Sequence, residues 1–129
     1  MTTWLNLMVV AAGGAVGSVS RYLITLFSAS IPGGSSMLGT TIANVIGCAA
    51  IGAFAQFTLA EGLVSEKTRL AIQVGFLGGL TTFSSFAAES TALAESGRWS
   101  MSGIYVAANL LLGWAALIAS ATLVKGSMT

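Results

Sequence analysis

The chain contains no histidine, a single cysteine, one proline and few charged side chains, and these scarcities exclude several classes of protein. Without histidine, no imidazole group is available to ligate a metal or to act as a general acid or base. Cys48 has no partner for a disulfide within the chain, and its small apolar neighbours predict a buried structural thiol. Charged residues make up 7% of the 129 residues, which is too few to cover the surface of a soluble domain.

The positions of the charges predict the fold. About 20 apolar residues in a helix span a bilayer, and charge-free stretches cover residues 1–20, 22–60, 70–88 and 99–124. The second stretch holds the end of one helix and a whole second helix, because residues 28–37 contain the only proline and two adjacent glycines. The sequence, with a mean hydropathy of +0.89, therefore predicts an all-α membrane protein. It forms a single domain over residues 1–129, with four transmembrane helices at about 4–27, 38–60, 69–94 and 99–124.

The basic residues are almost evenly divided between the two sides of the membrane. With four helices, both termini and the central connector lie on one side, together with Lys67, Arg69 and Lys125, while Arg98 and Arg21 belong to the other. Since basic residues normally mark the cytoplasmic side, this near balance predicts insertion in both orientations and an antiparallel, dual-topology homodimer. The sixteen glycines also favour close helix packing and an oligomer.

Several polar side chains fall within the apolar stretches, where each is costly unless it faces protein, water or a substrate. Asn44, in the second predicted helix, is suited either to an interhelical hydrogen bond or to a functional site. The same two readings apply to Asn109, which follows Tyr105 by four residues on one helix face. Glu89 is either an interfacial charge or a functional carboxylate.

The third stretch contains the segment GFLGGLTTFSSF at residues 75–86. Its glycines and threonines weaken a helix, which predicts a break near Gly78 and Thr81. Unwound backbone is tolerated in a membrane only where it is buried in protein or lines a cavity. Carbonyl oxygens freed by such a break are suitable ligands for a hard monovalent cation such as Na⁺, and freed amide groups or the N-terminus of a half-helix favour an anion.

Aromatic and hydroxyl side chains follow the predicted break. Phe83 and Phe86 are three residues apart and therefore share one face of a resumed helix. Ser84 and Ser85 lie between them, and Thr82 precedes them. Because the edge of an aromatic ring is positive, two rings beside hydroxyl donors are able to coordinate a small anion. Phenylalanines that only pack or face lipid are the alternative, and the spacing does not decide between the two.

Three segments resemble those of one family, the Fluc fluoride channels, also called CrcB proteins. They are GGAVGSVSRY at residues 13–22, GTTIANVIG at residues 39–47 and GFLGGLTTFSSF at residues 75–86. The resemblance covers almost the whole chain and implies a multi-pass protein of the bacterial inner membrane, an antiparallel homodimer with two pores. Such a channel is not an enzyme and binds no nucleic acid; it conducts F⁻ passively out of the cell, excludes Cl⁻ and lowers cytoplasmic fluoride.

The resemblance also implies roles for individual residues. The backbone carbonyls of Gly78 and Thr81 would hold a structural Na⁺ at the dimer interface. The matching pore residues are Phe83, Phe86, Asn44, Ser84, Ser85, Tyr105 and Asn109, and those at the vestibule or in support are Arg21, Glu89 and Thr82. The chain departs from the family pattern in three places: Asn109 and Gly113 stand where hydroxyl residues are common, and Ser85 replaces a threonine.

Two other functions fit a small four-helix membrane protein. A drug/proton exporter needs a membrane-embedded carboxylate in its first helix, but no Asp or Glu precedes Glu61. A structural, holin-like protein would not require the GGLTTFSSF segment or the two matched asparagines.

Overall fold

The computed structural model describes residues 2–62 and 64–128, which form helices joined by short connectors. The segments are α1 (Thr2–Ser30), α2 (Ser36–Glu61), α3 (Glu66–Arg69), the π-helix η1 (Leu70–Leu77), α4 (Gly78–Leu80), α5 (Phe83–Glu95) and α6 (Trp99–Ser127). Four units within these residues are long and apolar enough to cross a membrane: Thr3–Ser30, Ser36–Leu59, Glu66–Glu95 and Trp99–Ser127. The predicted all-helical architecture with four membrane-length units is confirmed. We refer to Glu66–Glu95 as the third span.

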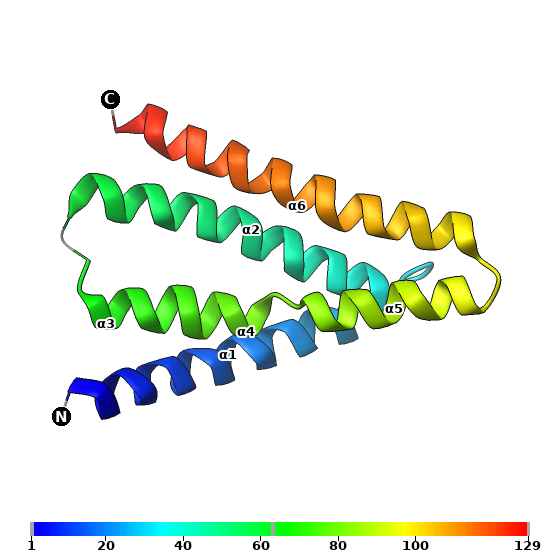
Figure 1. The fold of residues 1–129 in the computed structure, drawn as a ribbon, viewed down its shortest axis with the longest axis horizontal. Coiled ribbons are helices and arrows are strands. Elements are labelled where there is room, and N and C mark those ends of the chain that lie inside the picture. Colours follow the sequence, from blue (N-terminus) through cyan, green and yellow to red (C-terminus); the bar gives the residue numbers. More distant parts are fainter. Residues whose placement is uncertain (1, 63, 129) are drawn as a thin grey trace.

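The four units run up and down beside one another (Figure 1). Both ends of the chain and the connector between α2 and α3 lie at one end of the bundle, and the α5–α6 connector lies at the other. Helix α2 packs along α6, and α1 packs along η1, α4 and α2. Connectors begin and end with local caps: the Ser35 side chain accepts a hydrogen bond from the Leu38 amide, and Gly62 closes α2 with a left-handed φ of 60°.

Glycines allow α1 to lie directly against the backbone of the third span. A Cβ atom built on Gly13 would lie 2.2 Å from the Ala71 carbonyl oxygen, and one on Gly17 would lie 2.1 Å from the Phe76 carbonyl oxygen. From the other side, a Cβ on Gly79 would lie 2.6 Å from the Gly14 carbonyl oxygen. These distances are too short for any side chain, so the two backbones touch, as small residues permit in membranes.

The glycines of the third span are helical, and the residues that leave the helix follow them. Gly78 has φ −64° and ψ −34°, and the helical run continues to Leu80. Thr81 and Thr82 then have extended backbones, with φ −83° and ψ 152° for Thr81 and φ −148° and ψ 117° for Thr82. The unwinding expected from Gly78 onward is thus displaced toward two β-branched residues. The physical reason is that Gly79 packs against α1, which supports its helical backbone. We call Thr81 and Thr82 the extended pair.

The most buried apolar side chains lie close to the extended pair. Ala43, Leu77 and Leu80 form one cluster between α2 and the third span, and Phe86, Leu93 and Tyr105 form another between α5 and α6. Many large apolar side chains elsewhere are exposed, such as Trp99 at 72%, which suits helices that face lipid. The extended pair therefore lies between these two clusters along the third span.

Candidate ion-binding site

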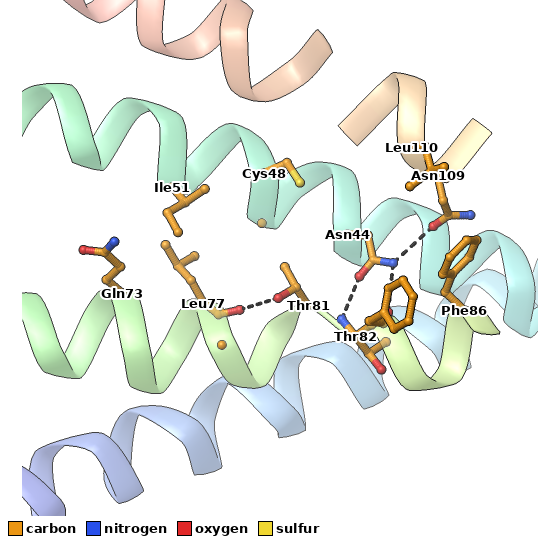
Figure 2. Close-up of a pocket in the computed structure, with 13 residues that line it drawn as sticks. Asn44, Cys48, Ile51, Gln73, Leu77, Thr81, Thr82, Phe86, Asn109 and Leu110 are labelled. Carbon is orange, nitrogen blue, oxygen red and sulfur yellow. Dashed lines mark hydrogen bonds between the residues drawn. The ribbon is translucent and has the colours of Figure 1, made fainter. Parts of the chain in front are cut away.

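A cavity of about 360 Å³ opens between α2, the third span and α6. Figure 2 shows its lining, which joins residues far apart in the sequence. Seven positions singled out in the sequence line it: Asn44, Gly78, Thr81, Thr82, Phe83, Phe86 and Asn109. The other lining residues are mostly apolar, and they include Gly47, Cys48, Ile51, Gln73, Leu77 and Leu110. An apolar cavity with a few convergent polar groups is typical of a binding site.

Asn44, on α2, holds Thr82 of the extended pair (Figure 2). The Thr82 amide donates to Asn44 Oδ1 at 2.7 Å, and Asn44 Nδ2 donates to the Thr82 carbonyl oxygen at 3.2 Å. In a continuous α-helix the Thr82 amide would instead reach the carbonyl of Gly78, four residues earlier. The Ser85 amide, which would reach the Thr81 carbonyl, donates to Thr82 Oγ1 at 3.2 Å. The carbonyls of Gly78 and Thr81 have therefore both lost their helical donors to side chains.

The two asparagines bind each other, and their amide hydrogens are used within the protein. Asn44 Nδ2 donates to Asn109 Oδ1 at 3.1 Å as well as to Thr82. Asn109 Nδ2 donates to Thr41 Oγ1 at 3.0 Å and to the Tyr105 carbonyl oxygen at 3.1 Å. An anion that binds either amide must therefore displace a protein acceptor, because both N–H groups of each carboxamide already donate.

Phe83 and Phe86 lie on one face of α5, as their spacing predicts, but in different surroundings. Phe86 is 7% exposed and Phe83 is 76% exposed. Their ring centroids are 5.5 Å apart with planes at 63°, an edge-to-face arrangement, and the Phe86 ring also lies 5.8 Å from that of Tyr105. One ring is thus fixed by packing, and the other presents its surface outside the single chain.

Glu89 points into the protein and accepts hydrogen bonds from two hydroxyl groups. The Tyr105 hydroxyl donates to Glu89 Oε2 at 2.5 Å, and Thr40 Oγ1 donates to Glu89 Oε1 at 3.1 Å. The structure thus places a half-buried carboxylate between α2, α5 and α6. Tyr105 joins this carboxylate to the asparagine pair, since its carbonyl oxygen accepts from Asn109.

Five predicted residues lie outside the cavity lining: Tyr105 and Glu89, described above, and Ser84, Ser85 and Arg21. Ser84 is exposed and Ser85 half-buried, and their hydroxyl oxygens lie 3.3 and 3.1 Å from Thr82 Oγ1. Arg21 lies on α1 at the other side of the third span, where its Nε donates to the Gly79 carbonyl oxygen at 3.1 Å. The serines therefore support the start of α5, and Arg21 binds the end of α4.

Two residues near the cavity were not predicted from the sequence, and the prediction for Cys48 was wrong. Thr40 and Thr41 precede Asn44 by four and three residues, and this helical spacing is the signal that could have identified them. Cys48, expected to be a buried structural thiol, is instead partly exposed on the cavity wall. Gly113 on α6 lies beside the thiol: a Cβ there would lie 3.3 Å from Cys48 Sγ.

Known proteins match this chain over almost all of its length. Residues 8–121 match the family model described as CrcB-like protein, Camphor Resistance (CrcB). A protein of Rhizobium etli named Fluoride-specific ion channel FluC is 38% identical over 121 residues, which cover 94% of this chain and 97% of that protein. Proteins with the same name from Rhizobium johnstonii and Rhodopirellula baltica are 39% and 37% identical, covering 94% and 97% of this chain and 97% of each relative.

Proposed function

Because the chain belongs to the CrcB-like family, we propose that it is a fluoride-specific ion channel that lets F⁻ leave the cell passively. The observation that carries this proposal is the 38% identity with a fluoride-specific channel over 94% of the chain. The cavity supports it, because amides, threonines and aromatic rings converge there at the depth of the membrane spans.

The chemistry of the cavity suits a small, strongly hydrated anion. A pore must replace the water around fluoride with hydrogen-bond donors, yet binding must be weak enough for release. Neutral groups meet both needs: the carboxamides of Asn44 and Asn109 can exchange a protein acceptor for the ion, and ring edges of Phe83 and Phe86 add weak positive potential. The exchange limits affinity, since each amide gives up an existing bond.

We also propose that the carbonyl oxygens of Gly78 and Thr81 hold a structural Na⁺. Hard oxygen ligands suit such a cation, and the residues present fit it, because the helical donors of both carbonyls bind Asn44 and Thr82 side chains instead. The bound cation would supply positive charge beside these two carbonyl oxygens, whose helical donors bind side chains instead. Two carbonyls are a partial ligand set, which a second subunit would complete.

The proposed assembly is an antiparallel homodimer in the bacterial inner membrane. Phe83 is 76% exposed in one chain although it belongs to the candidate pore, and a second copy would cover it. The nearly balanced basic residues suit insertion in both orientations. Two cavities related by the dimer axis would then give two pores.

Ion efflux from liposomes that contain the purified protein tests the proposal. Fluoride and chloride release are followed separately, with fluoride release expected to exceed chloride release by orders of magnitude. Phe86→Ile should abolish most fluoride flux, whereas Phe57→Ile, a change at an apolar position 44% exposed on α2, should retain it. Equal release of the two ions, or unchanged flux in Phe86→Ile, would contradict the proposal.

A further inference from the structure

Asn44 pairs with both backbone groups of a single residue, Thr82 (Figure 2). Its Oδ1 accepts from the Thr82 amide at 2.7 Å, and its Nδ2 donates to the Thr82 carbonyl at 3.2 Å. A carboxamide that binds in this way replaces the backbone partner that an extended residue would find in a β-sheet. Asn44 therefore stabilises the extended conformation of Thr82, whose amide would otherwise lack a partner in a membrane.

The same pairing controls two carbonyl groups. The Thr82 amide can donate either to Asn44 Oδ1 or, in a helical conformation, to the Gly78 carbonyl, but not well to both. Thr82 also caps α5 through its bond from the Ser85 amide, and an N-cap residue needs a non-helical backbone. If Thr82 became helical, Ser85 would donate to Thr81, so both carbonyls would be occupied together.

Helix α2 also contacts the extended pair through a glycine, Gly47. A Cβ atom on Gly47 would lie 2.2 Å from Thr81 Cγ2, so the Thr81 methyl group occupies the space that this glycine leaves. Gly47 follows Asn44 by three residues and lies on the same side of α2. Contact with Thr81 and hydrogen bonds to Thr82 thus come from one helix face.

We infer that Asn44 is a positioning residue for the cation site, a role separate from any contact with the permeating anion. By holding Thr82 in its extended conformation, Asn44 keeps the Gly78 and Thr81 carbonyls open to Na⁺. Asn44 Nδ2 also donates to Asn109. Loss of the hydrogen bond between these two side chains would therefore weaken the hold of Asn44 on Thr82, and with it the exposure of the two carbonyls to Na⁺. The inference rests on the proposed cation site.

The dependence of thermal stability on Na⁺ tests this role. The melting temperature of the detergent-solubilised protein is measured against NaCl concentration, with N-methylglucamine chloride keeping the ionic strength constant. Asn44→Leu removes both bonds to Thr82, and Asn44→Ser is too short to form them; each should raise the half-saturating Na⁺ concentration at least tenfold. Asn44→Asp keeps the acceptor for the Thr82 amide and should retain the Na⁺ response. Gln56→Leu, which removes an amide elsewhere on α2, should match the wild type.

The possible outcomes distinguish a failure of the positioning role from a failure of the proposed Na⁺ site. A wild-type response to Na⁺ that stays unchanged in Asn44→Leu and Asn44→Ser overturns the positioning role alone. A wild-type protein without any Na⁺ response overturns the cation site and the inference with it, while fluoride efflux still tests the channel function separately. The serine variant preserves the test if the leucine variant does not fold. A merely structural role would lower the melting temperature at every Na⁺ concentration without moving the half-saturation point.

Discussion

Replacing Gly17 by alanine measures how closely α1 approaches the third span. The added Cβ would lie 2.1 Å from the Phe76 carbonyl oxygen and 2.9 Å from the Leu80 amide nitrogen. Ordinary contacts begin at 3.4 Å, and the opposing atoms belong to the backbone, so they cannot rotate away as a side chain would. Helix α1 must therefore shift away from the segment that leads to the extended pair.

The expected cost follows from two opposing effects. Overpacking of this kind costs up to about 3 kcal/mol, while exchanging glycine for alanine within a helix returns roughly 0.5–1 kcal/mol. We expect Gly17→Ala to lower the free energy of unfolding by about 2 kcal/mol, a change of roughly 30-fold in the folding equilibrium. Fluoride flux should fall as well, because α1 supports the residues before the cavity.

Two other glycines, Gly14 on α1 and Gly103 on α6, provide matched controls. A Cβ on Gly14 would meet only the Gly75 carbonyl oxygen, at 3.8 Å, and a Cβ on Gly103 would meet nothing within 4 Å. Both alanine variants should be at least as stable as the wild type in thermal unfolding in detergent. If Gly17→Ala unfolds at the same temperature as Gly14→Ala, α1 does not pack on the third span as described.

Three further predictions concern single side chains. Arg21→Gln should destabilise the protein by about 1.5–3 kcal/mol in chemical unfolding, because it removes a charged hydrogen bond to the Gly79 carbonyl. Tyr105→Phe leaves the half-buried Glu89 carboxylate without its shortest donor, so thermal unfolding should show a loss of about 1–3 kcal/mol; unchanged stability would place the carboxylate elsewhere. A charged thiol reagent added to channels in liposomes should slow fluoride efflux by reacting with Cys48 on the cavity wall, and Cys48→Ser should be insensitive.

The membrane-length helices could be predicted because charge placement reports directly on the bilayer. The two conformations of the third span could not be located from composition alone. Gly78 and Gly79 have weak helical propensity but are helical, and Gly79 packs against α1, whereas Thr82 is held extended by a side chain from α2. Both effects depend on tertiary contacts, which override local propensity.

In the candidate site, too, some features could be predicted from the sequence and others depend on tertiary contacts. Helical spacing predicted that Phe83 and Phe86 share a face, yet only the packing of α6 shows that one is buried and the other exposed. Apart from the Tyr105 carbonyl, four residues before Asn109, the hydrogen-bond partners of Asn44 and Asn109 lie 38 or more residues away. No local pattern could therefore indicate that both donors of each carboxamide are engaged. The sequence predicted which residues form the site, but it did not predict their hydrogen-bond partners.

The extended pair also has an electrostatic consequence. It divides the third span into a helical run that ends at Leu80 and a second that begins at Phe83. The carbonyl end of the first run carries about half a negative charge, and the amide end of the second about half a positive charge. A continuous helix would place both partial charges at the membrane surfaces. Interrupted by two residues, the third span instead has a negative and a positive pole side by side in its interior, so it can favour a cation and an anion at neighbouring points without a charged side chain.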